Sequence, residues 1–142
     1  MSTVLARYPV AATGGDLARR TTRGVFVGVL AALVVSGIVT ALGHNLGASG
    51  AQSPFGAIPI IMSTVVAGVG AALAYAAVVR LTDRPVRNFT ALSTVVFVVM
   101  LVPVFAAAPA LGLSAVGQSA LVLIHVAVAV PLVAFVVGAV RL

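Results

Sequence analysis

Two long stretches of this 142-residue chain, residues 24–79 and 88–140, contain no Arg, Lys, Asp or Glu. A soluble domain carries charge on roughly a quarter of its residues, whereas here 7% are charged and 62% are hydrophobic. In lipid the backbone hydrogen bonds have to be satisfied within the spanning segment or in a closed barrel. The alternation of apolar and polar residues that a barrel requires is missing, so the stretches predict an all-α membrane protein.

Each uncharged stretch is too long for one crossing, because about 20 apolar residues span the hydrocarbon core as a helix. Each is also interrupted near its middle, at residues 43–57 and 107–118, by the Gly, Pro and Ser residues typical of turns. The predicted fold is therefore a four-transmembrane-helix bundle with up-down threading. The expected helices cover about residues 24–43, 58–80, 89–107 and 119–140.

The eight arginines occur in three short clusters, and the predicted threading puts all three clusters on one side of the membrane. The clusters are Arg7, Arg19, Arg20 and Arg23, then Arg80, Arg84 and Arg87, then Arg141. Positive charge favours the cytoplasmic side, so both termini and the 81–88 connection are expected in the cytoplasm, and the protein in the cell membrane. The arginines are expected to meet anionic lipid headgroups. Nucleic acid is not an expected partner, since no basic stripe comes with stacking aromatic residues.

The chain divides at residue 24 into an N-terminal arm, residues 1–23, and a transmembrane domain, residues 24–142. The arm is cytoplasmic or interfacial. Residues 16–23 form either a short interfacial helix that leads into the first span or part of an extended arm that rests on a neighbouring subunit. The first apolar run is too long for the core of a signal peptide, so we expect it to be retained.

His125 is the residue within the predicted spans that most merits a functional hypothesis, because a titratable side chain in a membrane is costly. Hydroxyl groups are expected at a similar depth, and Pro103 frees the carbonyl group of Val99 there. The candidate intramembrane polar layer is Ser36, Thr40, Ser63, Thr64 and His125. Either the layer contacts a solute or senses protons, or the neutral imidazole of His125 simply bridges helices by hydrogen bonds.

Small residues recur at helical spacing in the second and fourth predicted helices. Such residues let helix backbones approach each other in membranes. The candidate packing residues are Gly68, Ala71, Ala120, Ala127, Ala134 and Gly138. The face with Gly68 and Ala71 is expected to make the tightest helix contact of the subunit. The stripe on the fourth helix lies nearly opposite His125, which favours a homo-oligomer; alternatively, the stripe faces lipid.

Several kinds of chemistry lack the residues that they need. The chain has no cysteine, and the spans hold no carboxylate for ion-coupled transport. Known catalytic motifs and paired carboxylates are absent. His44 and His125 lack a third ligand for a metal. No catalytic, cofactor-binding or metal site is therefore predicted.

A small set of prolines and arginines gives the chain a family resemblance over roughly residues 20–140. These residues are Pro59, Arg84 and Pro85 in the 80–89 connection, Pro103, and His125 followed by Pro131. With them the chain resembles an uncharacterised family of small four-helix integral membrane proteins of actinobacteria and haloarchaea, which carry a domain of unknown function. The resemblance implies the four-helix topology and no particular activity.

The leading functional hypothesis is a multi-pass membrane protein without catalysis that self-associates or serves as an accessory subunit of a larger membrane assembly. The alternative is a channel or carrier for a small neutral solute, with Ser36, Thr40, Thr64 and His125 at its constriction. A third hypothesis is a membrane enzyme that uses His125.

Overall fold

The computed structural model describes residues 8–50 and 53–140. These residues contain four helices that are long and apolar enough to cross a membrane, and no strand. The helices are α2 (Gly14–Ala41), α3 (Ala57–Leu81), α4 (Pro85–Ala106) and α5 (Ala115–Val136). A short 3₁₀ helix, η1 (Pro109–Leu111), lies between α4 and α5. The prediction of an all-helical membrane protein is confirmed.

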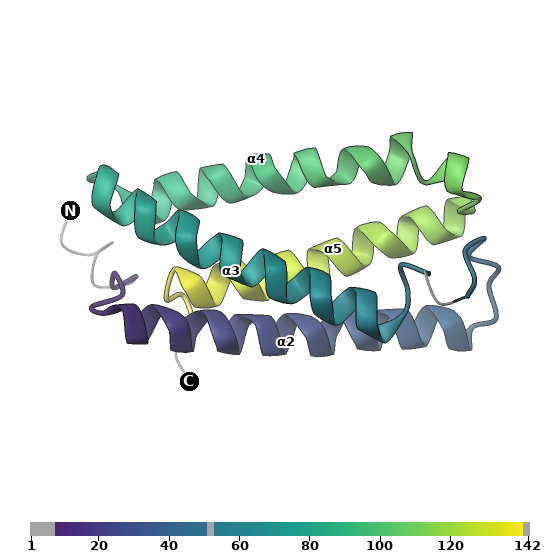
Figure 1. Cartoon of the computed structure of the whole chain (residues 1–142), viewed down its shortest axis with the longest axis horizontal. Helices are drawn as coiled ribbons and strands as arrows, with labels where there is room; N and C mark the ends of the chain where they lie inside the picture. Colours follow the sequence, from purple (N-terminus) through teal and green to yellow (C-terminus); the bar gives the residue numbers. More distant parts are fainter. Residues whose placement is uncertain (1–7, 51–52, 141–142) are drawn as a thin grey trace.

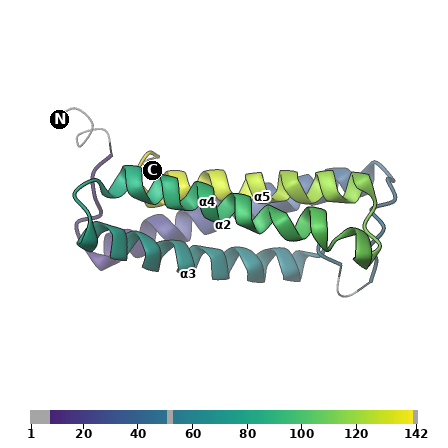
Figure 2. The same cartoon turned by 90° about the horizontal axis from the view of Figure 1, so that it is seen from above.

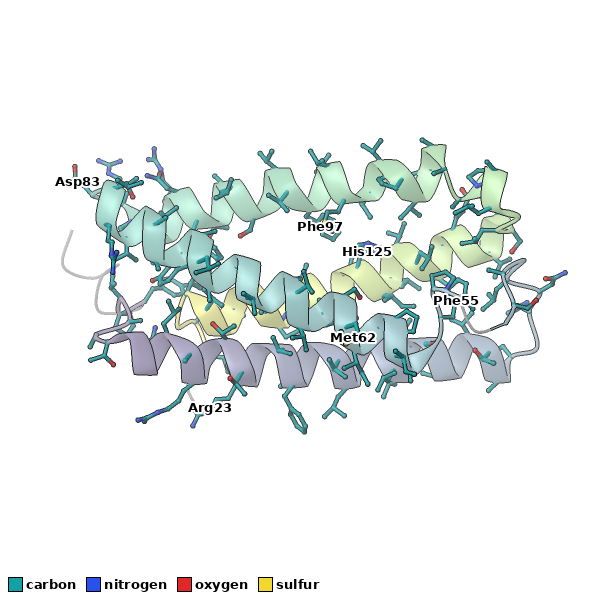
Figure 3. The ribbon with its side chains drawn as sticks, in the orientation of Figure 1. Arg23, Phe55, Met62, Asp83, Phe97 and His125 are labelled. Atoms are coloured by element: carbon teal, nitrogen blue, oxygen red, sulfur yellow. The ribbon has the colours of Figure 1, made fainter. Side chains whose placement is uncertain are left out.

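The four helices lie side by side along the long axis of the molecule (Figures 1 and 2). One end, which we call the arginine end, holds the start of α2 and the turn between α3 and α4; Figure 3 labels Arg23 and Asp83 there. The other end, the loop end, holds residues 42–50, 53–56 and 107–114. Every charged side chain of the described residues belongs to the arginine end, whereas Arg7 and Arg141 lie outside the described residues.

Helix α2 begins ten residues earlier than the predicted start at residue 24. The hydroxyl group of Thr13 caps it by accepting the N–H of Asp16 at 3.1 Å, and the Asp16 carboxylate favours the positive end of the helix dipole. Residues 16–23 are therefore neither a separate interfacial helix nor an extended arm. A helix of 28 residues is about 42 Å long, longer than the roughly 30 Å hydrocarbon core. The ten residues before the predicted start belong to the arginine end.

Helix α5 is displaced by four residues from the predicted 119–140. Ser114 caps its start by accepting the N–H of Gly117 at 3.0 Å. A left-handed Gly138 (φ +74°) ends it in a Schellman motif, with the N–H of Ala139 donated to the carbonyl of Ala134 at 2.8 Å. Consequently His125 lies near the middle of α5, about 15 Å from its first residue, instead of near its outer end.

The other two helices lie closer to their predicted ranges. Helix α3 differs by one residue at each end from the predicted 58–80. Helix α4 starts four residues before the predicted residue 89, because Pro85 occupies its first position, where the missing N–H costs no helical hydrogen bond.

The most extensive helix contact joins α2 and α5. A Cβ atom on Gly24 would lie 3.1 Å from the Cα atom of Leu132, and one on Gly28 would lie 3.4 Å from the carbonyl oxygen of Val128. The α2 residues buried in the protein are all small: Thr21, Gly24, Gly28, Ala32 and Ser36. The prediction that the Gly68 face of α3 makes the tightest contact is therefore wrong, since the closest backbone approach depends on the small residues of α2.

Helix α4 packs against the bundle mainly near its ends. Of its 22 residues, Pro85, Phe89 and Val104 are buried. The ring of Phe89 packs edge-on against the ring of Tyr75, with 5.1 Å between centroids. The middle of α4 lies over a hollow that is lined by residues of α3, α4 and α5.

The two connections at the loop end are hydrogen-bonded to each other. Ser114 donates its hydroxyl to the carbonyl of Asn45 at 2.6 Å and its N–H to the carbonyl of Leu46 at 3.1 Å. Gly47 has φ +84°, and a Cβ atom there would overlap the carbonyl of Gly112. This close backbone contact requires glycine at position 47.

Candidate functional site

A hollow of about 540 Å³, here the inner hollow, lies between α3, α4 and α5. Its volume is within the range of small-molecule sites, roughly 300–1,000 Å³. Small residues of α3 form one wall and larger side chains of α4 the other. The principal lining residues are Ser63, Thr64, Ala67, Gly70, Ala71, Leu92, Ser93, Phe97, Met100, His125 and Ala129.

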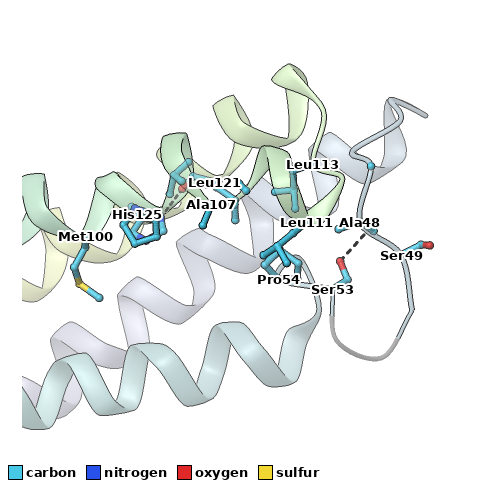
Figure 4. A pocket seen from close by; sticks show the side chains of 14 residues that line it. Ala48, Ser49, Ser53, Pro54, Met100, Ala107, Leu111, Leu113, Leu121 and His125 are labelled. Carbon is cyan, nitrogen blue, oxygen red and sulfur yellow. Dashed lines mark hydrogen bonds between the residues drawn. The ribbon is translucent and has the colours of Figure 1, made fainter.

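A second hollow of about 710 Å³, the outer hollow, opens toward the loop end. Ser49 and Ser53 of the α2–α3 connection and Leu111 of η1 are among its lining residues (Figure 4). Met100 and His125 line both hollows. These two side chains therefore border both hollows.

His125 makes a hydrogen bond within its own helix, with 2.7 Å between Nδ1 and the carbonyl oxygen of Leu121. A carbonyl oxygen can only accept, so Nδ1 carries the proton that is donated. In the neutral imidazole Nε2 is then an acceptor. The ring is half-buried and lies in the space between α4 and α5 (Figure 3). His125 was expected to form a hydrogen bond to a neighbouring helix. The hydrogen bond that it makes instead joins two residues of α5.

The predicted polar layer is divided in two. Ser63 and Thr64 line the inner hollow with His125, and both donate their hydroxyl protons to the carbonyl of Ile60, at 3.2 and 2.7 Å. Ser36 is buried and donates to the carbonyl of Phe55 at 2.8 Å, so it holds α2 against the segment before α3. Thr40 is exposed and donates to the carbonyl of Ser36 at 2.8 Å. Neither Ser36 nor Thr40 lines either hollow.

The candidate packing residues on α3 belong to two different surfaces. Gly68 faces α2, and a Cβ atom there would overlap the side chain of Val25. Ala71 lines the inner hollow instead.

The candidate packing residues of the fourth predicted helix also differ in their surroundings. Ala120 is buried, while Ala127 and Ala134 are half-buried. Gly138 lies beyond α5, where a Cβ atom would overlap the guanidinium group of Arg20. Gly138 therefore makes room for a cation instead of packing two helices.

The glycines that bring α2 and α5 together, Gly24 and Gly28, were not among the predicted packing residues. Their spacing is the GxxxG pattern, in which two glycines on one helix face allow close backbone approach in membranes. The pattern is readable in the sequence and was the signal that would have identified them.

Arg20 is turned into the protein, which corrects its predicted contact with lipid headgroups. Its guanidinium group pairs with the carboxylate of Asp16 at 2.8 Å and donates to the carbonyl of Pro9 at 2.8 Å. It also lies beside Gly138, at the negative end of the α5 dipole. The arginines that are exposed are Arg19, Arg23, Arg80, Arg84 and Arg87.

Two buried hydroxyl groups, those of Thr21 and Tyr75, have no hydrogen-bond partner among the described residues. Both belong to the arginine-end half of their helices, and Tyr75 is fully buried.

Within the described residues, no three His, Asp or Glu side chains gather to hold a metal ion.

Residues 12–142 match a family described as Family of unknown function (DUF6069). Comparison with curated proteins and with solved structures finds no match. The match covers all four helices, both hollows and His125, and it confirms the resemblance to a family of unknown function. The chain therefore belongs to this family.

Proposed function

We propose that the protein crosses the cell membrane four times in up-down order, with the arginine end in the cytoplasm together with both termini. The support is the one-sided charge: among the described residues, charged side chains belong to the arginine end and the loop end has none. Arginine near helix ends is retained on the cytoplasmic side. The exposed arginines then lie at the level of anionic headgroups.

Single cysteines test this orientation directly, because the natural chain has none. Ser49→Cys at the loop end is expected to react with a membrane-impermeant maleimide on intact cells. Asp83→Cys at the arginine end is expected to react only after permeabilisation. The opposite result at both positions contradicts the proposed orientation.

Within this topology, the function that the fold supports best is self-association without catalysis, as a homo-oligomer or as an accessory subunit of a larger membrane assembly. The observation that carries this proposal is the weak attachment of α4 to its own bundle. In lipid, helices associate through van der Waals packing and not through the hydrophobic effect. A helix with few internal contacts therefore gains most from a second protein surface.

The outward face of α4 offers such a surface. It is a valine stripe at helical spacing, made of Val95, Val98, Val99 and Val102, each more than half exposed. Branched side chains have few rotamers in a helix, so they lose little entropy on packing. We propose that this valine stripe is the association surface.

Disulfide cross-linking between copies tests the stripe against a matched position. Val98 on α4 is 57% exposed and Val34 on α2 is 59% exposed. Oxidation in native membranes is expected to give a dimer for Val98→Cys and none for Val34→Cys, because a disulfide needs Cβ atoms roughly 4 Å apart. A monomer in mild detergent, together with equal cross-linking at both positions, contradicts the proposal.

The channel or carrier hypothesis receives less support. Two of its four constriction residues, Ser36 and Thr40, lie away from both hollows, and Thr64 already donates its proton to the backbone. The described side chains therefore do not assemble the constriction that was expected.

A further inference from the structure

The inner and outer hollows share two lining side chains, those of Met100 and His125. The inner hollow is lined almost entirely by apolar side chains of α3, α4 and α5, at mid-helix depth. The lining of the outer hollow is also mostly apolar, but it includes two serines of the loop end, Ser49 and Ser53. A largely apolar space with one histidine at its border matches a molecule with an apolar chain and a small polar head.

The charge of the two linings restricts the head to a neutral group. None of the residues that line either hollow is Arg, Lys, Asp or Glu. The described arginines belong to the opposite end of the helices. A phosphate or carboxylate in the outer hollow would be partly desolvated without a cation to pair with it, which is costly.

His125 restricts the head further, to a group that can donate a hydrogen bond. Its Nδ1 is engaged with the carbonyl of Leu121, which leaves Nε2 as an acceptor in the neutral ring. Ser63 and Thr64, which also line the inner hollow, have already donated their hydroxyl protons to the carbonyl of Ile60. A hydroxyl group is the simplest neutral head that supplies the missing proton.

We propose that the inner hollow, with His125 at its border, binds a neutral, single-chain amphiphile with a hydroxyl head. The hydroxyl donates to Nε2 of His125, and the apolar chain fills the inner hollow between α3 and α4. This site is distinct from the valine stripe, which lies on the outward face of α4.

The hydrogen bond to His125 supplies the selectivity of this site. An apolar chain that enters from the bilayer leaves an environment as apolar as the hollow, so its burial contributes little. A hydrogen bond in low dielectric is stronger than in water, and a donor left without a partner there is penalised. Loss of the Nε2 acceptor is therefore expected to weaken binding about tenfold.

The probe for the test is hexadecanol with a diazirine in the middle of its chain, added to the full-length protein in mild detergent. After photolysis, peptide mass spectrometry is expected to find the label on residues of the inner hollow, such as Phe97 and Ala129. Unlabelled hexadecanol is expected to compete for the site. Hexadecane, which lacks the donor, and hexadecanoate, which carries a charge, are expected to compete at least about tenfold less well.

Two pairs of variants complete the test. His125→Phe keeps a ring of similar size but removes the acceptor, and it is expected to reduce labelling about tenfold; His44→Phe, at the exposed histidine of the loop end, is its control. Ala129→Phe fills the inner hollow and is expected to abolish labelling, whereas Ala77→Phe, on the exposed face of α3, is expected to leave it unchanged. Circular dichroism establishes that each variant is folded.

Three results overturn the proposal. The first is a label spread evenly over the exposed faces of α2 and α4, which is the pattern of bulk detergent or lipid. The second is competition by hexadecanoate equal to that by hexadecanol. The third is full labelling of folded His125→Phe and Ala129→Phe.

Discussion

The two sides of the bundle are packed in opposite ways. On one side, glycines of α2 bring its backbone against α5, with little space between them. On the other side, Phe97 and Met100 of α4 project into the inner hollow. Both sides are apolar, so hydrophobicity does not distinguish them. Side-chain size does: small residues at helical spacing give a rigid pair of helices, and large ones leave an adaptable space.

The sharpest test of the close-packed side is Gly24→Leu. The new side chain would have to displace Leu132 and Phe135 of α5, so we expect a loss of about 3 kcal/mol in the free energy of unfolding. Gly37→Leu is the control, since it lies on the same helix with no other heavy atom within 4 Å of a Cβ there. Thermal unfolding followed by circular dichroism in detergent measures both. Equal melting temperatures would remove the distinction between the two sides.

Arg20→Ala tests whether the close-packed side extends to the arginine end. The variant loses the ion pair with Asp16 and the hydrogen bond to Pro9. Asp16 is 38% exposed, so water can solvate its carboxylate when the arginine is removed. We therefore expect the free energy of unfolding to fall by about 1.5 kcal/mol, which lies between the losses typical of surface and of buried ion pairs. Arg19→Ala, at the exposed neighbouring position, is expected to change the melting temperature little. A larger loss for Arg19→Ala would contradict the inward role of Arg20.

Tyr75→Phe removes a buried hydroxyl group for which the described residues supply no partner. Because that group loses its water on folding without gaining a hydrogen bond, its removal is expected to raise the free energy of unfolding by up to about 1 kcal/mol. Thr21→Val is expected to act in the same direction. A loss of stability in both variants would show that the hydroxyl groups are bonded in the membrane, for example to a buried water molecule.

Ala71→Leu is the matched test of the adaptable side and has the smallest expected effect. The larger side chain extends into the inner hollow, so the free energy of unfolding is expected to change by less than about 1 kcal/mol. The melting temperature in detergent measures this change. The same substitution at the fully buried Ala32 of α2 is expected to lower the free energy of unfolding by about 3 kcal/mol. If Ala71→Leu is as harmful as Ala32→Leu, the inner hollow is closed in the membrane.

The sequence predicts the elements of this fold better than their ends. The absence of charge from residues 24–79 and 88–140 requires four apolar helices, which the structure contains. The helix ends depend instead on caps. Thr13 with Asp16 starts α2 well before the apolar run begins, and Ser114 starts α5 inside the expected turn. Both capping residues are of types that favour this position, so both helix starts are readable in the sequence from their caps.

The surroundings of the candidate site were harder to predict. Helical phase puts Arg20 on the same face as Gly24 and Gly28, so its inward position is readable once that face is known to pack. The partner of His125 is not readable, because it depends on a rotamer that the neighbouring helices allow. The inner hollow depends on how far α4 lies from α3, which hydrophobicity does not determine.

The extensive pairing of α2 with α5 has a consequence for biosynthesis. These are the first and the last of the described helices, so their contact joins segments about a hundred residues apart in sequence. Contacts of such long range form slowly. During synthesis α2 enters the bilayer well before its principal neighbour exists, and its glycine face is then covered only by lipid. The close packing of α2 against α5 therefore has to follow the insertion of α5.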